Sequence, residues 1–390
     1  MMQGKNQKDL KEENSSVIIR LIREEANISR ADIVRKTGLT PPTVSRIVST
    51  FVKRGLVKES LYNTNSVGRK PLSLTFNGNS LYVLSVEISY QYINISVVSL
   101  AGRIIQSVHV QTTTAISEKG LLDLLFSKGK ELLKVYGEKQ FIGVGITCPG
   151  MVDPETRTLI KIPNLHNISN FGIGEAVQKE IGLPVLVAND ANGEALGEKY
   201  FGVGNVKDFV LLHLGYGIGA GIVLNNKLYQ GNFGVSGEVG HISVSNSKAN
   251  KCDCGNYGCV ELFGGMNSLI KECSEVLPSI KSIEDVKTFA GHDERIRQII
   301  YEHAELIGNV LVSVVNILSP QKIVVSGPQS ILGDFLITPI KKVVDSRSFY
   351  SFGKKISIVQ SNLRENEGII GAMTVVLDSF LSNPHRFITL

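Results

Sequence analysis

The sequence is poor in cysteine and has no long apolar run. Only 5 of its 390 residues are cysteine, so the disulfide framework that stabilises many small secreted domains is not expected. No apolar run reaches the roughly 18 residues that a membrane-spanning helix needs. The start of the chain, MMQGKNQKDLKEEN, lacks the apolar core of a signal peptide. We therefore predict a cytoplasmic protein that has no membrane partner.

The charge of the chain is unevenly distributed. Residues 1–75 contain 14 lysines and arginines against 7 aspartates and glutamates, whereas the rest of the chain contains 27 against 29. A basic first fifth on a near-neutral body indicates a module that meets a polyanion. The hydrophobic fraction of 43% is ample for packed cores, and the length allows two or three domains.

Four potential metal ligands lie in the segment from Gly237 to Glu261. They are His241, Cys252, Cys254 and Cys259. One imidazole and three thiolates close a tetrahedral shell around Zn²⁺ and leave no position for water, so we predict a structural zinc ion. Three buried thiols and a core histidine would be the ordinary alternative, but free cysteines rarely cluster beside a histidine in an intracellular chain.

Two carboxylates, Glu238 and Glu261, flank these ligands. Folding around a metal would hold them with His241 on one rigid loop, where they could bind the hydroxyl groups of a small polyol. A sugar site is therefore predicted. The segment resembles the zinc motif of the ROK family of sugar kinases and sugar-responsive repressors, which is matched by His241 and by CDCGNYGC at 252–259. The resemblance implies that Glu238, His241 and Glu261 touch the sugar while His241 also binds zinc.

The first part of the chain has the pattern of three helices. Apolar residues at helical spacing predict an amphipathic helix over residues 14–25. Ser29 is placed to cap a second helix over 30–36, and Thr40 to cap a third from about 41 to 54. This is a helix-turn-helix pattern, in which the third helix reads the major groove of DNA. The residues predicted on or near its outer face are Thr43, Ser45, Arg46 and Ser49.

The segment LVKESLYNTNSVGRKPLSLTF predicts two short strands around a polar loop. Such a hairpin is the wing of a winged helix, and its GRKP tip carries Arg69 and Lys70. Two cations on a thin tip suit a narrow minor groove. A winged helix used for protein contact is the alternative, but the basic charge and the loop chemistry favour operator DNA. We predict a winged helix-turn-helix DNA-binding domain over residues 1–75.

After the wing, the pattern is that of a two-lobed α/β body. Three successive apolar strands are followed by a helix over residues 117–136 and by the strand FIGVGITCPG. A similar order follows PVLVAND through FVLLHLG, the glycine-rich turn YGIGAG and IVLNNKLY. A meander followed by βα units, seen twice, resembles the actin-like fold of sugar kinases and Hsp70. We expect a first lobe over 76–188, completed by a C-terminal helix over 366–382, and a second lobe over 189–365, with the ligand between them.

The resemblance to the ROK family covers nearly the whole chain, because a winged helix before a two-lobed body is the arrangement of its repressor branch. CPGMVD matches the turn whose glycine, here Gly150, closes on the sugar, and IPNL matches a segment whose Asn164 reaches it. ANDAN matches the motif in which Asn189 holds a sugar hydroxyl and Asp190 is the general base of the kinases. Asp190 could also cap a helix, which is compatible with hydroxyl binding. The family further implies a homodimer or homotetramer.

The phosphate loops of the kinase members are not matched. Those members carry Asp-x-Gly-Gly-Thr-Lys where this chain reads EISYQY from Glu87, so Ser89 and Tyr90 replace two glycines. The change places a ring where phosphate would lie. Tyr216 stands where the kinases usually carry threonine, and SGP at 326–328 replaces a more glycine-rich turn. Phosphoryl transfer depends on positioning and stabilising the phosphates, so we predict no enzymatic activity, with Asp190 as a vestigial base.

Together these patterns predict a transcriptional regulator, a repressor of sugar uptake or catabolism genes, that binds a sugar or sugar phosphate in the inter-lobe cleft. An ATP-dependent sugar kinase with an added DNA-binding domain is the alternative, which Asp190 and the glycines within 215–221 keep open. A regulator that is controlled by a protein partner and has no small ligand is a third possibility.

Overall fold

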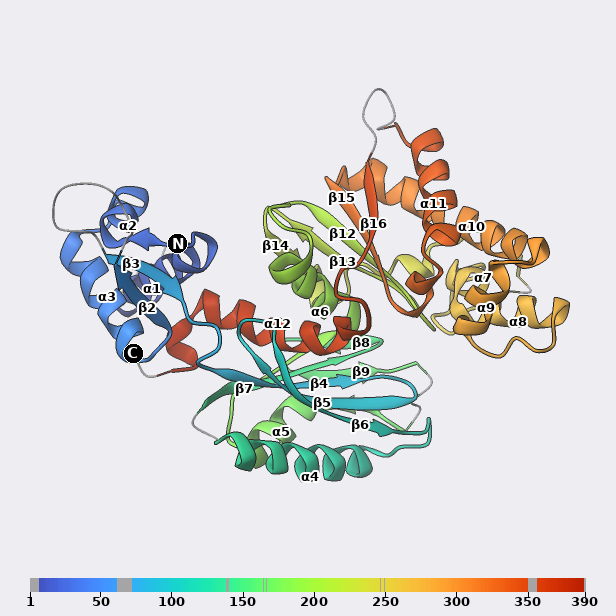
Figure 1. Cartoon of the computed structure of the whole chain (residues 1–390). Coiled ribbons are helices and arrows are strands. Elements are labelled where there is room, and N and C mark those ends of the chain that lie inside the picture. Colours follow the sequence, from blue (N-terminus) through green and yellow to red (C-terminus); the bar gives the residue numbers. More distant parts are fainter. Residues whose placement is uncertain are drawn as a thin grey trace.

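The computed structural model describes residues 7–61, 72–137, 140–163, 165, 167–245, 247–248, 250–349 and 356–388. It consists of a winged helix-turn-helix domain followed by a two-lobed α/β body (Figure 1), which confirms the predicted fold class. Within the described residues, no helix is long and apolar enough to cross a membrane.

The winged helix domain combines three helices with a small antiparallel sheet of order β1-β3-β2. Its elements are α1 (Gln7–Glu24), β1 (Ile28–Ser29), α2 (Arg30–Thr37), α3 (Pro41–Lys53), β2 (Val57–Leu61) and β3 (Leu72–Phe76). The Ser29 hydroxyl accepts from the Asp32 amide while the Asp32 carboxylate accepts from the Ser29 amide, a reciprocal cap that starts α2. Thr40 stands at the N-cap of α3, but its hydroxyl meets Thr43 Oγ1 at 3.0 Å and caps no amide.

The first helix begins earlier than apolar spacing predicts. Residues 7–13 are mostly polar but contain good helix formers, so they extend α1 without adding to its apolar stripe. The core of the domain lies beneath α1 and α3, where Ile18, Val48 and Phe51 are fully buried.

Lobe one is a five-stranded sheet of order β11-β7-β4-β5-β6 with helices on both faces. Its elements are β4 (Tyr82–Ile88), β5 (Tyr92–Ser99), β6 (Ile104–Gln111), α4 (Glu118–Tyr136), β7 (Phe141–Cys148), β8 (Met151–Asp153), β9 (Thr158–Lys161), β10 (Ser169–Phe171), α5 (Ile173–Ile181), β11 (Val185–Asn189) and α12 (Glu367–Ser382). Helices α4 and α5 cover one face, and α12 from the C-terminal part of the chain covers the other (Figure 1).

Lobe two repeats the same strand arrangement, in the order β14-β13-β12-β15-β16. Its strands are β12 (Phe209–Leu214), β13 (Ile218–Leu224), β14 (Lys227–Tyr229), β15 (Lys322–Ser326) and β16 (Ser357–Gln360). Its helices are α6 (Asp190–Gly197), α7 (Glu261–Gly264), α8 (Met266–Val276), α9 (Ile283–Ala290), α10 (Glu294–Leu318) and α11 (Asp334–Arg347). Among the described residues, the structure also contains the π-helix η2 (Glu198–Gly202) and the 3-10 turns η3 (Asn232–Gly234), η4 (Val239–His241), η5 (Pro328–Leu332), η7 (Arg364–Asn366) and η8 (Pro384–Arg386).

The glycine-rich segment after β12 is mostly strand, which corrects the prediction of a turn over YGIGAG. Strand β13 begins at Ile218, so Gly219 and Gly221 lie within it. A Cβ on Gly221 would lie 2.3 Å from the Ala191 carbonyl oxygen. These glycines therefore let α6 pack directly on the sheet, a close approach that sequence patterns alone do not distinguish from a turn.

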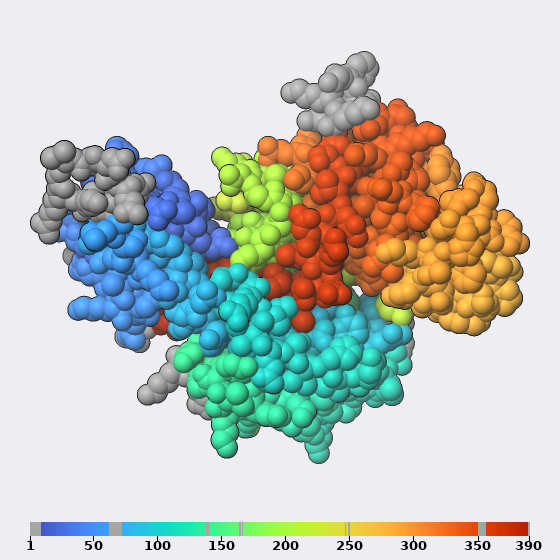
Figure 2. Space-filling model, viewed as in Figure 1, coloured from blue at the N-terminus to red at the C-terminus, as the bar shows by residue number. Residues whose placement is uncertain are grey.

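The winged helix domain packs beside lobe one, where it shares a hydrophobic core with α12. Ile19 of α1 and Phe380 of α12 are fully buried in this core, and the Ser16 hydroxyl donates to the Leu381 carbonyl at 2.7 Å. Figure 2 shows the blue N-terminal domain as a distinct body at one end of lobe one. The winged helix domain is thus anchored to the end of one long helix of the body.

Candidate functional site

The end of β11 and the start of α6 place Asn189 and Asp190 between the lobes. The Asn189 side chain accepts from the Asn192 amide at 3.3 Å and donates to the Gly150 carbonyl at 3.0 Å. Gly150 has φ 86, and a Cβ there would lie 2.4 Å from the Lys161 carbonyl oxygen. Only glycine fits this position. The hydrogen bond from Asn189 to Gly150 holds the turn after β7 against the start of α6.

Asp190 is the first residue of α6, and its carboxylate accepts from the Ala191 amide at 2.8 Å. Burial raises the pKa of Asp190 to about 6, although the nearby His213 lowers it. Such a carboxyl is ionised at neutral pH and can accept a hydrogen bond from a hydroxyl group.

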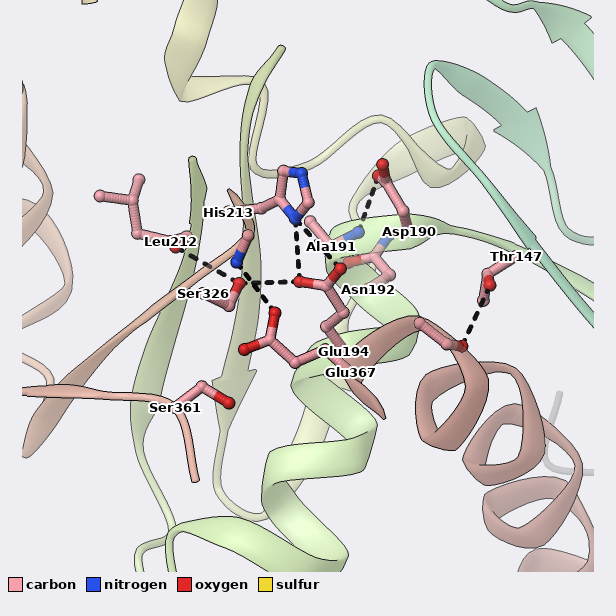
Figure 3. Close-up of polar contacts among 12 residues, drawn as sticks. Thr147, Asp190, Ala191, Asn192, Glu194, Leu212, His213, Ser326, Ser361 and Glu367 are labelled. Carbon is pink, nitrogen blue, oxygen red and sulfur yellow. Dashed lines mark hydrogen bonds and ion pairs between the residues drawn. The ribbon is translucent and has the colours of Figure 1, made fainter. Parts of the chain in front are cut away.

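A buried polar cluster beneath Asp190 was missed by the sequence analysis (Figure 3). His213 of β12 lies 3.0 Å from both Glu194 carboxylate oxygens, and Ser326 donates to Glu194 at 2.7 Å. Burial alone would lower the pKa of His213, but Glu194 raises it to about 10, so the pair is ionic. A histidine inside the apolar run FVLLHL, together with a glutamate inside a helix of small residues, was the available signal.

The four predicted metal ligands come together in the loop before α7. One donor atom from each lies within 4.8 Å of every other, and they are His241, Cys252, Cys254 and Cys259. Cys254 Sγ is 3.7 Å from Cys259 Sγ, and Cys252 Sγ is 3.7 Å from His241 Nδ1. A tetrahedral zinc ion with Zn–S bonds of about 2.3 Å sets its sulfurs roughly 3.8 Å apart. The donor set and its spacing therefore fit zinc.

The loop closes because Gly258 adopts φ 66, and a Cβ there would lie 1.9 Å from the Ser245 carbonyl oxygen. This close contact draws the Cys259 end of the loop back against the segment that follows His241. The two are joined by the bridge between Ser243 and Cys259. The metal cluster is thus built from residues that backbone pairing brings together.

Two further carboxylates lie beside this cluster. Glu261 begins α7 and accepts from the Ile218 amide at 2.9 Å, which holds it against the start of β13. Glu238 Oε2 is 3.8 Å from His241 Nε2. Burial raises the pKa of Glu238, His241 lowers it, and Asp190 and Glu261 raise it further. Glu238 therefore lies near enough to Asp190 and Glu261 to feel their charges.

Two aromatic side chains, Tyr90 and Tyr216, line the space between the lobes together with Asp190. Tyr90 and Tyr216 pack edge to face with ring centroids 5.4 Å apart, and Gln91 Nε2 donates to the Tyr216 hydroxyl at 2.7 Å. A cavity of about 400 Å³ lies here. Residues of both lobes line it, among them Glu87 of lobe one and His213 of lobe two. Tyr90 belongs to the segment EISYQY, which the sequence analysis compared with the phosphate loop of the kinases.

The predicted DNA-binding residues on α3 lie at the surface of the winged helix domain. Arg46 is exposed, and Thr43, Ser45 and Ser49 are partly exposed. Ser49 accepts from Arg30 at 3.4 Å, so it already contacts α2. The predicted wing cations Arg69 and Lys70 and the predicted sugar contact Asn164 lie outside the described residues.

Comparison with known proteins finds a family model for each of the two parts of the chain. A sequence model of the ROK family matches residues 83–379, and a model of winged helix-turn-helix DNA-binding domains matches residues 12–58. The chain belongs to the ROK family. This ROK protein is 30% identical to the xylose repressor of Caldicellulosiruptor bescii over 96% of its own length and 98% of that protein. It is 26% identical to the DNA-binding transcriptional dual regulator NagC of Escherichia coli over 96% of its own length and 94% of that protein.

Two solved structures frame the comparison of this ROK protein. A ROK family transcriptional regulator, a homologue of the E. coli MLC protein, superposes with a TM-score of 0.84 at 26% identity and covers 96% of this chain and 97% of that chain. A ROK family glucokinase from Streptomyces griseus, in complex with glucose and AMPPNP, superposes with a TM-score of 0.65 at 26% identity. The match covers 98% of the glucokinase but 75% of this chain.

Proposed function

We propose that this protein is a DNA-binding transcriptional repressor of sugar uptake or catabolism genes, controlled by a sugar or sugar phosphate bound between its lobes. The observation that carries the proposal is the end-to-end similarity to xylose repressors, which includes the winged helix. The glucokinase, matched over nearly its whole length, accounts for only part of this chain. We propose a DNA-binding domain over 1–75, a first lobe over 76–188 completed by the C-terminal helix, and a second lobe over 189–365.

The proposed sugar site combines amide, carboxylate and imidazole groups from both lobes. Its members are Gly150, Asn164, Asn189, Asp190, Glu238, His241 and Glu261. Carboxylates accept from sugar hydroxyls, and the Asn189 amide already spans the turn at Gly150. Asp190 and Glu261 both act electrostatically on Glu238, and this proximity supports one shared ligand.

We propose a structural zinc ion held by His241, Cys252, Cys254 and Cys259. Because Nδ1 of His241 faces Cys252, a metal would be bound through Nδ1 and the proton would remain on Nε2, the atom that faces Glu238. The ion would supply rigidity to the loop, and His241 would present a fixed donor toward the cleft.

We propose that operator DNA is bound by α3 in the major groove and by the wing in the minor groove. Thr43, Ser45, Arg46 and Ser49 would face the base edges, and Arg69 and Lys70 would follow the narrow groove. Helix-turn-helix proteins bind paired half-sites, so two copies must be joined, as a homodimer or homotetramer.

The competing function is sugar phosphorylation by ATP, which the kinase-like position of Asp190 favours. Against it, Tyr90 and Tyr216 stand at positions where the family resemblance implies glycine and threonine in the kinases. We therefore propose a sensor with no enzymatic activity.

One experiment tests the proposal directly. A preferred DNA duplex is first selected by the purified protein from a random-sequence pool, and its affinity is then measured at fixed salt with and without sugar. The panel is xylose, glucose, N-acetylglucosamine and glucose 6-phosphate, with Asp190→Ala as the binding-site control. We expect one sugar to weaken operator binding in the wild type only. A sugar that binds the wild type tightly but leaves operator affinity unchanged overturns the proposal.

A further inference from the structure

Arg23 of α1 packs against two aromatic rings of the π-helix η2. Its guanidinium carbon is 4.5 Å from the ring centroid of Tyr200 and 5.5 Å from that of Phe201. Its Nη2 also donates to the Tyr200 carbonyl at 3.4 Å. Contacts of this kind are stronger when the cation is desolvated, and Arg23 is only partly exposed. We call these three side chains the Arg23 clamp.

The helix that carries Tyr200 begins at the candidate sugar site. Helix α6 starts at Asp190, ends at Gly197 and runs directly into η2. At a rise of about 1.5 Å per residue, the distance from Asp190 to Tyr200 along the helix is roughly 15 Å. The widened turn of η2 is closed by the Val203 amide, which donates to the Glu198 carbonyl at 2.8 Å. One continuous helical segment therefore joins the site to the winged helix domain.

Outside its own domain, α1 also contacts the C-terminal part of the chain, at α12 and η8. Arg20 Nη2 donates to the Ser382 hydroxyl at 2.6 Å, and Ser16 donates to the Leu381 carbonyl. Helix α12 packs on β4 and β7 of lobe one, whereas α6 packs on β12 and β13 of lobe two. The helix α1 thus touches both lobes, through α12 at one point and through η2 at another. Helices α6 and α12 also pack directly on each other, where Gly193 and Gly371 meet. A rotation of the lobes that slides one helix on the other would displace the two supports of α1.

Polar ties hold η2 against α12 in the present arrangement. The Tyr200 hydroxyl donates to Asp378 at 2.5 Å, and Lys199 Nζ is 2.8 Å from the same oxygen. On the other side, Phe201 packs so closely on the hairpin of lobe one that a Cβ on Gly102 would lie 2.9 Å from its ring. These ties all involve residues 199–201, so a small shift of η2 can exchange them as a set.

We propose that the Arg23 clamp transmits sugar binding at the start of α6 to the DNA-binding domain. This inference rests on the proposed function, because it needs both operator DNA and a sugar. Without sugar, the clamp holds α1 in the orientation that binds operator. A sugar that joins Asn189 and Asp190 to Glu238 and Glu261 moves α6 with η2 and releases α1. The sugar acts only through its different affinity for the two arrangements.

The quantity to measure is the coupling factor, defined as the ratio of operator Kd with saturating sugar to operator Kd without it. The full-length protein, the selected duplex and xylose as the first probe are used. Arg23→Leu is expected to reduce the coupling factor about tenfold, the range of a partly desolvated cation–π contact. The affinity of the free protein for xylose, measured by calorimetry, should stay within about twofold, since Arg23 is remote from the site.

Arg20→Leu is the matched control. It removes the same charge from the same helix, but Arg20 donates to Ser382 of α12 and not to η2, so the coupling factor should be retained. Tyr200→Leu removes the contact between Arg23 and the Tyr200 ring but leaves the Phe201 ring and the Tyr200 carbonyl in place. It should therefore reproduce part of the effect of Arg23→Leu, and the double variant should lose no more coupling than Arg23→Leu alone. Arg23→Lys keeps the charge but lacks the planar guanidinium, so it should lose part of the coupling even if Arg23→Leu folds poorly.

The outcomes separate the two proposals. If the wild type responds to sugar and both Arg23→Leu and Tyr200→Leu show the same coupling factor as the wild type, the proposed role of the Arg23 clamp is overturned. The proposed function then still stands. If the wild type binds operator but responds to no sugar of the panel, both are overturned. A selective loss of coupling at Arg23 and Tyr200, with retention at Arg20, supports the clamp.

Discussion

Tyr90 of lobe one and Tyr216 of lobe two pack edge to face, 5.4 Å between ring centroids, and bridge the lobes at the start of β13. Gln91 reinforces the bridge by donating to the Tyr216 hydroxyl. Burial, followed by the charges of Asp190 and Glu261, raises the pKa of Tyr90, so its phenol stays neutral beside these carboxylates. The two rings thus stand together with Asp190 around the cavity between the lobes.

We therefore expect no sugar kinase turnover. The measurement is a coupled assay with ATP and magnesium over glucose, xylose and N-acetylglucosamine. Tyr90→Gly should stay inactive as well, because the threonine and lysine of the kinase loop are also absent. A wild-type turnover of about one per second or faster, an ordinary enzyme rate, contradicts the sensor function.

Loss of a zinc ligand should destabilise the protein and weaken sugar binding together. His241→Ala and Cys254→Ala remove one ligand each, and we expect both to lower Tm by several degrees and to lose bound zinc. Metal analysis, thermal melting and sugar calorimetry are the measurements. Cys273→Ala is the control, since Cys273 is buried in the core of lobe two outside the cluster, and it should keep its zinc. A purified wild type without zinc refutes this prediction.

Sugar affinity should fall as the pH drops below about 6. Burial raises the pKa of Asp190 to about 6, and protonation removes the acceptor that a sugar hydroxyl needs. Calorimetry from pH 5 to pH 8 tests this, and Asp190→Asn should bind weakly and with a flatter pH profile. An unchanged affinity of the wild type across that range would show that Asp190 does not hold the sugar through its ionised form.

The same carboxyl predicts a stability change of defined sign. The pKa of Asp190 is raised from 3.8 to about 6 in the folded protein, so between these values the folded state binds more protons than the unfolded state. Its contribution to stability is fully present below pH 3.8 and is lost as the pH rises to about 6. Asp190→Asn should therefore gain Tm relative to the wild type on going from pH 4 to pH 7.5. A constant difference in Tm at both pH values contradicts the raised pKa.

Arg46 should contribute to operator binding and to base preference. It is the exposed cation among the predicted contacts of α3, and loss of a base contact costs about 1–3 kcal/mol. Arg46→Ala should weaken binding about tenfold or more and relax the selected sequence. Arg295→Ala is the control, because Arg295 pairs with Asp293 at the surface of lobe two. Equal operator affinity for both variants would remove Arg46 from the interface.

The close packing of α6 on β13 gives a prediction about stability. A Cβ on Gly221 would lie 2.3 Å from the Ala191 carbonyl oxygen and 2.4 Å from Ala195 Cβ, so Gly221→Ala should destabilise the protein by about 2 kcal/mol or more. Gly172→Ala is the matched control, since Gly172 has φ −73 and no atom within 4 Å of an added Cβ. Thermal or urea unfolding compares the two. Similar stabilities would show that α6 can move away from the sheet at little cost.

The sequence by itself determined those helices, strands and ligand clusters that depend on residues close together in the chain. Apolar spacing and the cap at Ser29 placed the second helix, and a thiol-rich segment with one histidine defined the donor set of the metal cluster. The apolar strands of both lobes were also readable, because strands that are buried on both faces, such as β7 and β12, appear as short continuous apolar runs. A resemblance to a known family then supplied candidate roles that spacing alone does not contain.

Only the tertiary structure decided which distant residues meet. Arg23 and Tyr200 are separated by 177 positions in the chain, and Ser326 and Glu194 by 132. No local pattern marks these pairs, because each depends on how α1, α6, α12 and the two sheets pack together. The glycines of β13 show the same limit: the sequence presents them as a turn, and the approach of α6 reveals them as a packing surface. Contacts between helices and strands depend on how the whole core packs. Each helix or strand itself depends mainly on residues that are close together in the chain.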